Sequence, residues 1–373
     1  MTREEFQKEG VNRWFGLGKK GCIAYATGVG KSKVALDCIS KFRASYPFLK
    51  IYIVTPTEEM RDRDWILEFQ KWNVSTDFVE ILCYASLMKT DISDAGMIVT
   101  DECHRLTLQQ LKKIDKYSKN LALLGLTATY PKLNHFKEDT IQRIQMLNFL
   151  FPVIHTVTTD EAVENGYIND FQINTLFIPL DKVLKNTYKT AIRTEAQQYE
   201  VLCSRMQAAI SSSKEYLIYR AIADRMHFIY NLPSKEKVAA DIISKSDNLL
   251  VFCGSIHQAE SLCGRYVYHS KSKDTWLTRF QNQEIKKLAC VKALNEGKNL
   301  YFNPDSLIVQ VDSQERNLVQ RIGRTIRKIA NLKSDRKSVI NILVSKGTVD
   351  EKWYRSCISD MNTSRINEIN YEQ

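Results

Sequence analysis

The chain has 373 residues and a formal net charge of +10, and this length predicts two domains, each able to bury its own core. Apolar residues make up 44% and charged residues 26%, while Gly (14) and Pro (7) are sparse, which excludes collagenous, low-complexity and long disordered chains. No apolar run approaches the roughly 18 residues needed to cross a bilayer, and the first residues lack the apolar stretch of a secretion signal. We therefore expect an intracellular two-domain protein with no membrane partner, and we take a monomer as the default.

The nine Cys residues are scattered and include no C-x-x-C pair, which argues against a zinc ribbon and against a disulfide framework. Cys22, Cys38, Cys83 and Cys253 lie among apolar residues and are expected to act as small core hydrophobes.

The first 130 residues alternate short apolar runs with segments of helical period. The expected strands are Cys22–Tyr25, Ile51–Val54, Met97–Thr100 and Leu121–Leu126, and the expected helices include Lys31–Ala44 and Arg61–Trp72. Such alternation requires right-handed crossovers and a parallel sheet. Ligands bind such folds at the carboxyl ends of the strands.

The stretch from about residue 181 to residue 246 has no Gly and only one Pro, and it predicts a helical insertion or a hairpin of helices. Lys185, Lys189 and Arg193 have the i, i+4, i+8 spacing of one helix face. That face is either solvated or in contact with nucleic acid.

Alternation of strands and helices resumes after this insertion and predicts a second α/β domain. The expected strands are Leu249–Phe252, Leu307–Val311 and Asn341–Val344, and the expected helices are His257–Tyr266, Leu318–Ile329 and Asp350–Asp360. Between Glu315 and Lys337 the chain is rich in Arg and Lys. A run of this kind fits either a solvated face or contact with a polyanion.

The strongest motif is the run Ala26-Thr27-Gly28-Val29-Gly30-Lys31-Ser32, which lies between an expected strand and an expected helix. Gly28 and Gly30 let the backbone N–H groups turn toward a phosphate, next to the positive end of the helix. Lys31 would contact the β- and γ-phosphates of ATP, and the Ser32 hydroxyl would bind Mg²⁺. The full Walker A pattern has Gly or Ala where this chain has Tyr25.

Two adjacent acids follow the strand Met97–Thr100, in the run Asp101-Glu102-Cys103-His104. Asp101 can hold Mg²⁺, while Glu102 can polarise the water that attacks the γ-phosphate. A Thr-Ala-Thr run, which contains Thr127 and Thr129, ends the strand Leu121–Leu126.

The last motif is Gln320-Arg321-Ile322-Gly323-Arg324-Thr325-Ile326-Arg327. On a helix, Gln320, Arg324 and Arg327 would lie at i, i+4 and i+7 and project from one face. Arg suits a phosphate clamp because its planar fork binds phosphate oxygens in pairs.

In this order the motifs resemble the superfamily 2 helicases and translocases of the DExH-box type, over nearly the whole chain. The resemblance implies two RecA-like parallel-sheet domains in tandem, residues 1–158 and 159–373, with the helical insertion at about 181–246. It implies ATP and Mg²⁺ as cofactors, with Gln7 reading adenine and Arg324 and Arg327 acting as arginine fingers. Motif V resembles Ala293–Gly297, which adds Gly297 to the nucleotide-binding residues, although Asn299 replaces the acid that often follows.

The resemblance also implies contacts to nucleic acid and a coupling of hydrolysis to movement. Motif Ia resembles Thr55-Pro56-Thr57 and motif IV resembles Leu250–Ser255, so Pro56, Thr57 and Ser255 would contact phosphates. His104, Thr127 and Thr129 would couple hydrolysis to movement of the nucleic acid.

The run Asp101–Thr107 resembles the DNA-directed branch, which includes type III restriction subunits, phage recombination helicases and repair translocases. We expect sequence-independent binding of single-stranded, forked or branched DNA and a cytoplasmic location, that of the host cell if a phage encodes the chain. Alternatives are an RNA helicase or RNA-stimulated ATPase, and a non-catalytic nucleic-acid-binding subunit.

Overall fold

The computed structural model describes residues 1–131, 138–188, 191–269, 272, 275–291, 300, 302–312, 315–328, 337–359 and 361–372. Gly297 and the rest of the expected motif V (residues 293–297) lie outside the described residues, as does Lys189. The chain forms two units, Met1–Ile168 and Asn169–Gln373. The first unit thus extends ten residues beyond residue 158 and includes α7 (Thr159–Glu164), which follows β6 (Val153–Val157).

The first unit contains a six-stranded sheet in the order β3-β2-β4-β5-β1-β6, in which every recorded pair of neighbours is parallel. The other strands are β1 (Lys20–Tyr25), β2 (Lys50–Thr55), β3 (Val79–Cys83), β4 (Ala95–Asp101) and β5 (Ala122–Thr127). The expected parallel α/β order is confirmed. Because all the strands run the same way, the carboxyl ends of β1, β4 and β5 lie at one edge of the sheet. The three motifs that follow these strands therefore lie at that edge too.

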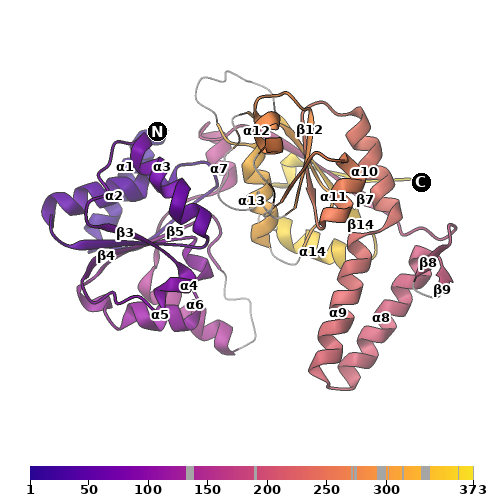
Figure 1. Ribbon diagram of the computed structural model, residues 1–373, viewed down its shortest axis with the longest axis horizontal. Helices are drawn as coiled ribbons and strands as arrows, with labels where there is room; N and C mark the ends of the chain where they lie inside the picture. The colour runs from indigo at the N-terminus through magenta and orange to yellow at the C-terminus, as the bar shows by residue number, and fades with distance from the viewer. Residues whose placement is uncertain are drawn as a thin grey trace. The chain divides into compact units, whose positions relative to one another are not determined.

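Helices cover both faces of this sheet (Figure 1). One side carries α1 (Arg3–Gly16), α2 (Lys31–Ser45) and α3 (Trp65–Lys71), and the other carries α4 (Tyr84–Leu87), α5 (Leu108–Asp115) and α6 (Glu138–Leu150). Successive strand residues point to opposite faces. Tyr52, Val54, Ile98 and Leu123 therefore share one buried cluster with side chains of α4, α5 and α6.

The helix expected at Arg61–Trp72 has a different start in the structure. A π-helical turn, η1 (Met60–Asp64), comes first, and α3 begins only at Trp65. The described residues also form three short 3₁₀ turns, which are η2 (Cys103–Arg105), η3 (Ser118–Asn120) and η4 (Thr363–Arg365).

The second unit contains a seven-stranded sheet in the order β11-β12-β10-β13-β14-β7-β15, again with parallel recorded pairs. Its strands are β7 (Phe171–Ile178), β10 (Leu249–Cys253), β11 (Val267–His269), β12 (Lys287–Val291), β13 (Asp305–Ile308), β14 (Ser338–Ser345) and β15 (Ile366–Asn370). The strands expected near residues 249, 307 and 341 are confirmed as β10, β13 and β14. The strands β7 and β15, which extend the sheet beyond β14, were not expected.

The helices of the second unit are α8 (Glu195–Ser211), α9 (Glu215–Tyr230), α10 (Pro233–Lys245), α11 (Ile256–Cys263), α12 (Thr275–Gln281), α13 (Glu315–Thr325) and α14 (Val349–Ile358). Val238, Ala239 and Ile243 of α10 belong to the buried cluster of this unit, together with side chains of β10, β12 and β13. Thus α10 is part of the core rather than of a separable insertion.

The insertion begins as a strand hairpin and then becomes helical. β8 (Asn186–Tyr188) pairs antiparallel with β9 (Ala191–Arg193), so the single helix face expected for Lys185, Lys189 and Arg193 is wrong. Thr187 pairs with Ile192, and β-branched residues favour strands. After β9, α8 and α9 form an antiparallel pair (Figure 1), as the helical hairpin reading predicts.

A buried carboxylate anchors this hairpin to the rest of the unit. Glu195 Oε2 accepts hydrogen bonds from Asp181 N (2.9 Å) and Ser234 Oγ (2.8 Å), and its Oε1 accepts one from Ser234 N (2.9 Å). Tyr199 Oη accepts a further hydrogen bond from Val349 N at 2.9 Å. Glu195 therefore joins the start of the insertion, at Asp181, to the start of α10, at Ser234.

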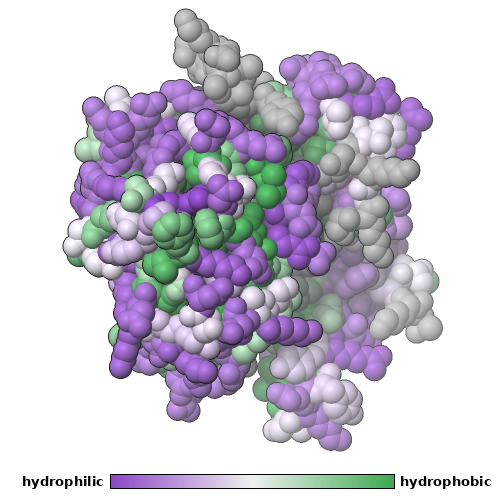
Figure 2. All heavy atoms as spheres, turned by 60° about the vertical axis from the view of Figure 1, so that its left-hand side comes forward, coloured by the Kyte–Doolittle hydropathy of each residue, from purple (hydrophilic) through white to green (hydrophobic). Residues whose placement is uncertain are grey.

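The face of the molecule in Figure 2 is largely hydrophilic, with apolar side chains exposed between polar ones. Across the described residues, no helix combines the length and the apolar character that crossing a bilayer would require.

Candidate nucleotide site and motor motifs

The loop between β1 and α2 has the geometry of a phosphate-binding turn. Gly28 and Gly30 have φ values of 92° and 102°, a region open to glycine and costly for other residues. Gly30 is the N-cap of α2, so Lys31 and Ser32 lie in the first helical turn, where backbone N–H groups lack helical partners. Lys31 Nζ donates to Tyr25 O at 3.2 Å. The loop is thus suited to bind an anion.

Tyr25, which departs from the Walker A pattern, keeps its backbone carbonyl in the loop and turns its side chain into the core. Its hydroxyl lies 2.6 Å from His155 Nδ1, and a Cβ added at Gly10 would lie 2.4 Å from that hydroxyl. The large side chain is therefore accommodated because α1 has a glycine opposite it.

Gln7 is buried on α1 and contacts the phosphate-binding loop directly. Its Nε2 donates to Val29 O at 2.8 Å. Arg3, one helical turn earlier, donates to Val29 O (3.0 Å) and Gly28 O (2.7 Å). Arg3 was not among the expected site residues, although its i−4 spacing from Gln7 is visible in the sequence.

Asp101 ends β4 and is buried, with its carboxylate in contact with a tryptophan. Trp65 Nε1 donates to Asp101 Oδ2 at 3.2 Å. Burial and the neighbouring Glu102 carboxylate raise the pKa of Asp101 to about 7, while Lys31 and the Trp65 hydrogen bond act to lower it. A cation beside this carboxylate would therefore stabilise its charged form.

Glu102 has left-handed backbone angles (φ 52°, ψ 51°) although it is not a glycine. Such strained conformations cluster at functional sites. Its Oε2 lies 3.4 Å from His104 Nδ1, and that nitrogen lies 2.7 Å from Thr127 Oγ1. Thr127 Oγ1 in turn accepts the Thr129 N–H at 3.0 Å. The structure thus brings the two acids, His104 and the Thr-Ala-Thr run into one connected group.

One further arginine fixes the turn that carries these groups. Arg143 of α6 donates through Nη1 to His104 O (2.8 Å) and Leu106 O (3.3 Å). No sequence pattern marks Arg143, because its partners are backbone carbonyls far away in the chain.

The site fits magnesium by the kind of donors present. In the part of the chain that the structure describes, no three His, Cys, Asp or Glu side chains gather as a metal-binding group. Mg²⁺ is commonly held by one or two carboxylates together with phosphates and water. Asp101 and the Ser32 hydroxyl match that donor set.

The arginine motif in the second unit is only partly helical. Gln320 and Arg324 are buried on α13, but α13 ends at Thr325, so the expected common helix face with Arg327 is wrong. The helix ends because Ser338 Oγ donates to Thr325 O (3.0 Å) and Asn169 N donates to Ile326 O (2.8 Å). Arg327 therefore lies two residues beyond the end of α13 and does not share a helix face with Gln320 and Arg324.

Arg321 has a structural environment of its own. Its Nη1 donates to Gln310 O at 2.8 Å, and its Nη2 lies 3.7 Å from Asp312 Oδ2. It therefore ties α13 to the segment that follows β13.

The residues expected to contact nucleic acid cap local turns in the structure. Thr57 Oγ1 accepts the Met60 N–H at 3.3 Å, and Ser255 Oγ accepts the Gln258 N–H at 3.1 Å. Both hydroxyls can still donate a hydrogen bond while they accept one. Pro56 is half-buried between β2 and this turn.

Fold and motifs together define the class of protein: the resemblance to the superfamily 2 helicases and translocases is confirmed. Residues 78–132, which span β3 to the Thr-Ala-Thr run, match the family model "Type III restriction enzyme, res subunit".

Two curated relatives carry names from one group of DNA motors. The DNA 3'-5' translocase XPB2 of Sulfurisphaera tokodaii is 22% identical over 94% of this chain and 83% of the relative. The general transcription and DNA repair factor IIH helicase/translocase subunit XPB of Dictyostelium discoideum is 21% identical over 94% of this chain. The chain spans only 44% of that second protein.

Two solved structures share the fold. The helicase domain of Pyrococcus furiosus Hef aligns with a TM-score of 0.55 and 14% identity, over 94% of this chain and 97% of that domain. The ATP-dependent type ISP restriction-modification enzyme LlaBIII bound to DNA aligns with a TM-score of 0.61 and 12% identity, over 99% of this chain and 31% of the enzyme.

Proposed function

We propose that the chain is an ATP-dependent DNA helicase or translocase, which couples ATP hydrolysis to movement on DNA, to its unwinding or to branch migration. One observation carries this proposal. The loop that contains Lys31 and the end of the strand that contains Asp101 lie at the same edge of the sheet. The Lys31 charge acts to lower the pKa of Asp101, so the two groups influence one another. The names of the XPB relatives favour DNA as the substrate.

Each residue of the first unit has a distinct proposed role in hydrolysis. Lys31 would neutralise the β- and γ-phosphates, while Ser32 and Asp101 would hold Mg²⁺. Bound Mg²⁺ would neutralise the charge that develops on the phosphates. Glu102 would take the proton of the attacking water, and His104 Nδ1, which lies 3.4 Å from Glu102 Oε2, would help to orient the carboxylate for that step.

The second unit would supply the cations that stabilise the transferred phosphoryl group. Arg324 and Arg327 are proposed as arginine fingers, a role worth about 10³–10⁵ in kcat where it has been measured in other phosphoryl-transfer enzymes. Gln320 and Gly297 complete the proposed nucleotide contacts.

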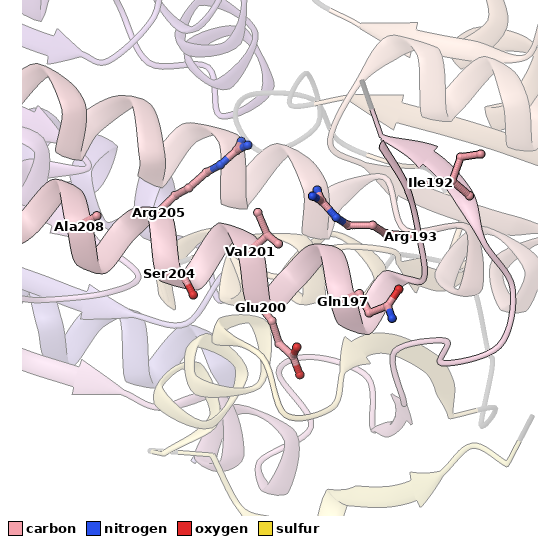
Figure 3. Close-up of a pocket in the computed structure, with 8 residues that line it drawn as sticks. All are labelled: Ile192, Arg193, Gln197, Glu200, Val201, Ser204, Arg205 and Ala208. Atoms are coloured by element: carbon pink, nitrogen blue, oxygen red, sulfur yellow. The ribbon is translucent and has the colours of Figure 1, made fainter. Parts of the chain in front are cut away.

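The α8–α9 hairpin is the proposed element that separates or grips strands. A concavity of about 820 Å³ lies along α8 and β9 (Figure 3). It is lined by Ile192, Arg193, Gln197, Glu200, Val201, Ser204, Arg205 and Ala208. Figure 3 shows Arg193 and Arg205 pointing toward one another on one side of α8, with Glu200 on another side. Two neighbouring guanidinium groups suit a phosphate backbone.

Steady-state ATPase activity tests the proposed function directly. We expect strong stimulation by single-stranded, duplex or forked DNA over matched RNA, a steep loss of binding with salt, and no hydrolysis by Glu102→Gln. Stimulation by RNA alone would overturn the choice of DNA and favour the RNA-stimulated ATPase. No hydrolysis with any nucleic acid would favour the non-catalytic binding subunit.

A deletion tests the hairpin separately, and the structure sets its limits. Residues 203–225 can be replaced by a short Gly-Ser linker, because packed helices lie about 8–10 Å apart and Glu195, Tyr199 and α10 are all retained. We expect DNA-stimulated ATPase to persist and unwinding or branch migration to be lost. Loss of both activities would make the hairpin a structural element. Arg193→Ala/Arg205→Ala is the matched point variant, with Glu200→Ala as its control.

We also propose a monomer in the cytoplasm, that of the host cell if a phage encodes the chain. Sedimentation of the chain with and without forked DNA tests the monomeric state.

A further inference from the structure

A buried tryptophan contacts the carboxylate that we propose for Mg²⁺. Trp65 is 2% exposed, and its indole N–H donates to Asp101 Oδ2 at 3.2 Å. An indole has one donor and no acceptor, and a buried donor needs a partner. When Asp101 is ionised, as it would be beside a bound cation, this hydrogen bond is of the stronger, charge-assisted type.

The backbone of Trp65 is joined to the segment before it, because Trp65 N donates to Met60 O. Thr57 accepts hydrogen bonds from Met60 N through Oγ1 (3.3 Å) and from Arg61 N through its carbonyl (3.2 Å). The π-helical turn Met60–Asp64 then leads into Trp65. Single π-helical turns are rare and frequent at functional sites. Here the turn sets the position at which the indole enters the core.

The backbone of Asp101 has a second, independent anchor. Tyr84 Oη donates to Asp101 O, and Tyr84 O accepts a hydrogen bond from Gln110 Nε2 at 2.8 Å. Loss of the indole N–H would therefore leave the main chain of Asp101 in place, and among the described residues the Asp101 carboxylate would keep only the backbone hydrogen bond from Glu102.

We propose that Trp65 is a positioning residue, whose indole N–H fixes the Asp101 carboxylate in the orientation that accepts Mg²⁺ with the nucleotide. This inference rests on the proposed ATPase function and adds a residue that no motif of the chain contains. Groups that orient a metal ligand from outside the coordination sphere commonly change metal affinity or activity by about 10–100-fold when they are removed.

The test measures binding of a fluorescent, non-hydrolysable ATP analogue to the full chain, with Mg²⁺ and with EDTA. In Trp65→Phe we expect the Mg²⁺-dependent gain in affinity to fall about tenfold, with unchanged affinity in EDTA. Trp72→Phe is the matched control, because Trp72 closes the same helix and donates to Glu68 Oε2 at 3.0 Å on the surface. We expect Trp72→Phe to behave as the wild type.

A second variant removes the N–H without removing the shape. Benzothienylalanine at position 65 keeps a bicyclic ring and lacks the donor, so it should reproduce the loss even if the Phe variant folds poorly. In an Asp101→Asn background, neither change should reduce the Mg²⁺ effect further, since Trp65 acts through Asp101.

The outcomes separate this inference from the proposed function. A full Mg²⁺ effect in both variants at position 65 would overturn the positioning role, as would an equal loss with Mg²⁺ and with EDTA. A wild-type chain whose nucleotide affinity does not respond to Mg²⁺ would instead overturn the proposed ATPase.

Discussion

His104 Nδ1 lies 2.7 Å from Thr127 Oγ1, and both side chains are buried in the first unit. This hydrogen bond connects the end of β4 to the end of β5, and Glu102 Oε2 lies 3.4 Å from the same His104 nitrogen. A change at Thr127 can therefore reach the residue proposed to activate water.

We expect Thr127→Val to weaken the coupling of hydrolysis to movement. The substitution keeps the shape and removes the hydroxyl that contacts His104 and the Thr129 backbone. We expect a cost of about 1–3 kcal/mol, because buried polar groups lose a hydrogen bond. DNA-stimulated ATPase should fall less than displacement of a third strand from duplex DNA, measured on the same preparation. Thr129→Ala is the comparison, because Thr129 joins the group through its backbone N–H. Equal losses in the two assays would argue against coupling through Thr127.

We expect Gly10→Ala to destabilise the first unit by about 1–3 kcal/mol, although alanine is the better helix former. The added Cβ would lie 2.4 Å from the Tyr25 hydroxyl. In a Tyr25→Phe background the clashing oxygen is gone, so the same substitution should cost much less. Urea denaturation of the two single variants and the double variant measures this difference. Additive effects would show that the hydroxyl is not the cause.

A fully buried ion pair supports the turn from β14 into α14, at residues 346–350 of the second unit. Lys235 Nζ lies 2.7 Å from Asp350 Oδ2, and the same oxygen accepts the Ser345 N–H at 2.8 Å. We expect Lys235→Met to lower the free energy of unfolding by about 3–5 kcal/mol, because it leaves a buried charge uncompensated. Adding Asp350→Asn should restore part of that loss, since the amide is neutral. Chemical denaturation monitored by circular dichroism checks both values.

His155 makes the stability of the first unit depend on pH. Burial and the positive charge of Arg13 lower the pKa of His155, against the opposing effect of Glu9. The unfolded chain then binds a proton at a higher pH than the folded chain does. The contribution of neutral His155 to the free energy of unfolding is therefore fully present above about pH 6.5, the ordinary pKa of His. This contribution falls as the pH drops toward the pKa of His155 in the folded chain. Denaturation of wild type and His155→Gln between pH 8 and pH 5 tests this, and parallel curves would contradict it.

Much of the nucleotide site could be predicted from local sequence. Gly28, Gly30 and Lys31 follow a strand and begin a helix, and Asp101 and Glu102 end another strand, so chain order alone places them at one edge of a parallel sheet. Arg3, Trp65 and Arg143 could not be predicted in this way. Each reaches the site through a contact with a backbone carbonyl or a side chain distant in the chain. The spacing of Arg3 from Gln7 is visible in the sequence, but it does not reveal the carbonyls that Arg3 contacts.

Helical spacing between basic residues gave wrong predictions at two places, because residues with that spacing can also lie on a strand or beyond the end of a helix. Lys185 and Arg193 fit one helix face by their spacing, but the second of them lies on β9, where cross-strand pairing outweighed the periodicity. Arg327 fits the face of Gln320 and Arg324, but hydrogen bonds from Asn169 and Ser338 end α13 before it.

The sequence by itself determined the two α/β units and the position of the motifs at the ends of strands, because strand, loop and helix signals are local and their chain order limits the topology. Only the tertiary structure decided which partners complete those motifs. Gly10 faces Tyr25, Trp65 faces Asp101, and Lys235 pairs with Asp350 at a separation of 115 residues. Such pairs depend on the packing of whole elements against one another, which the periodicity of one segment does not encode.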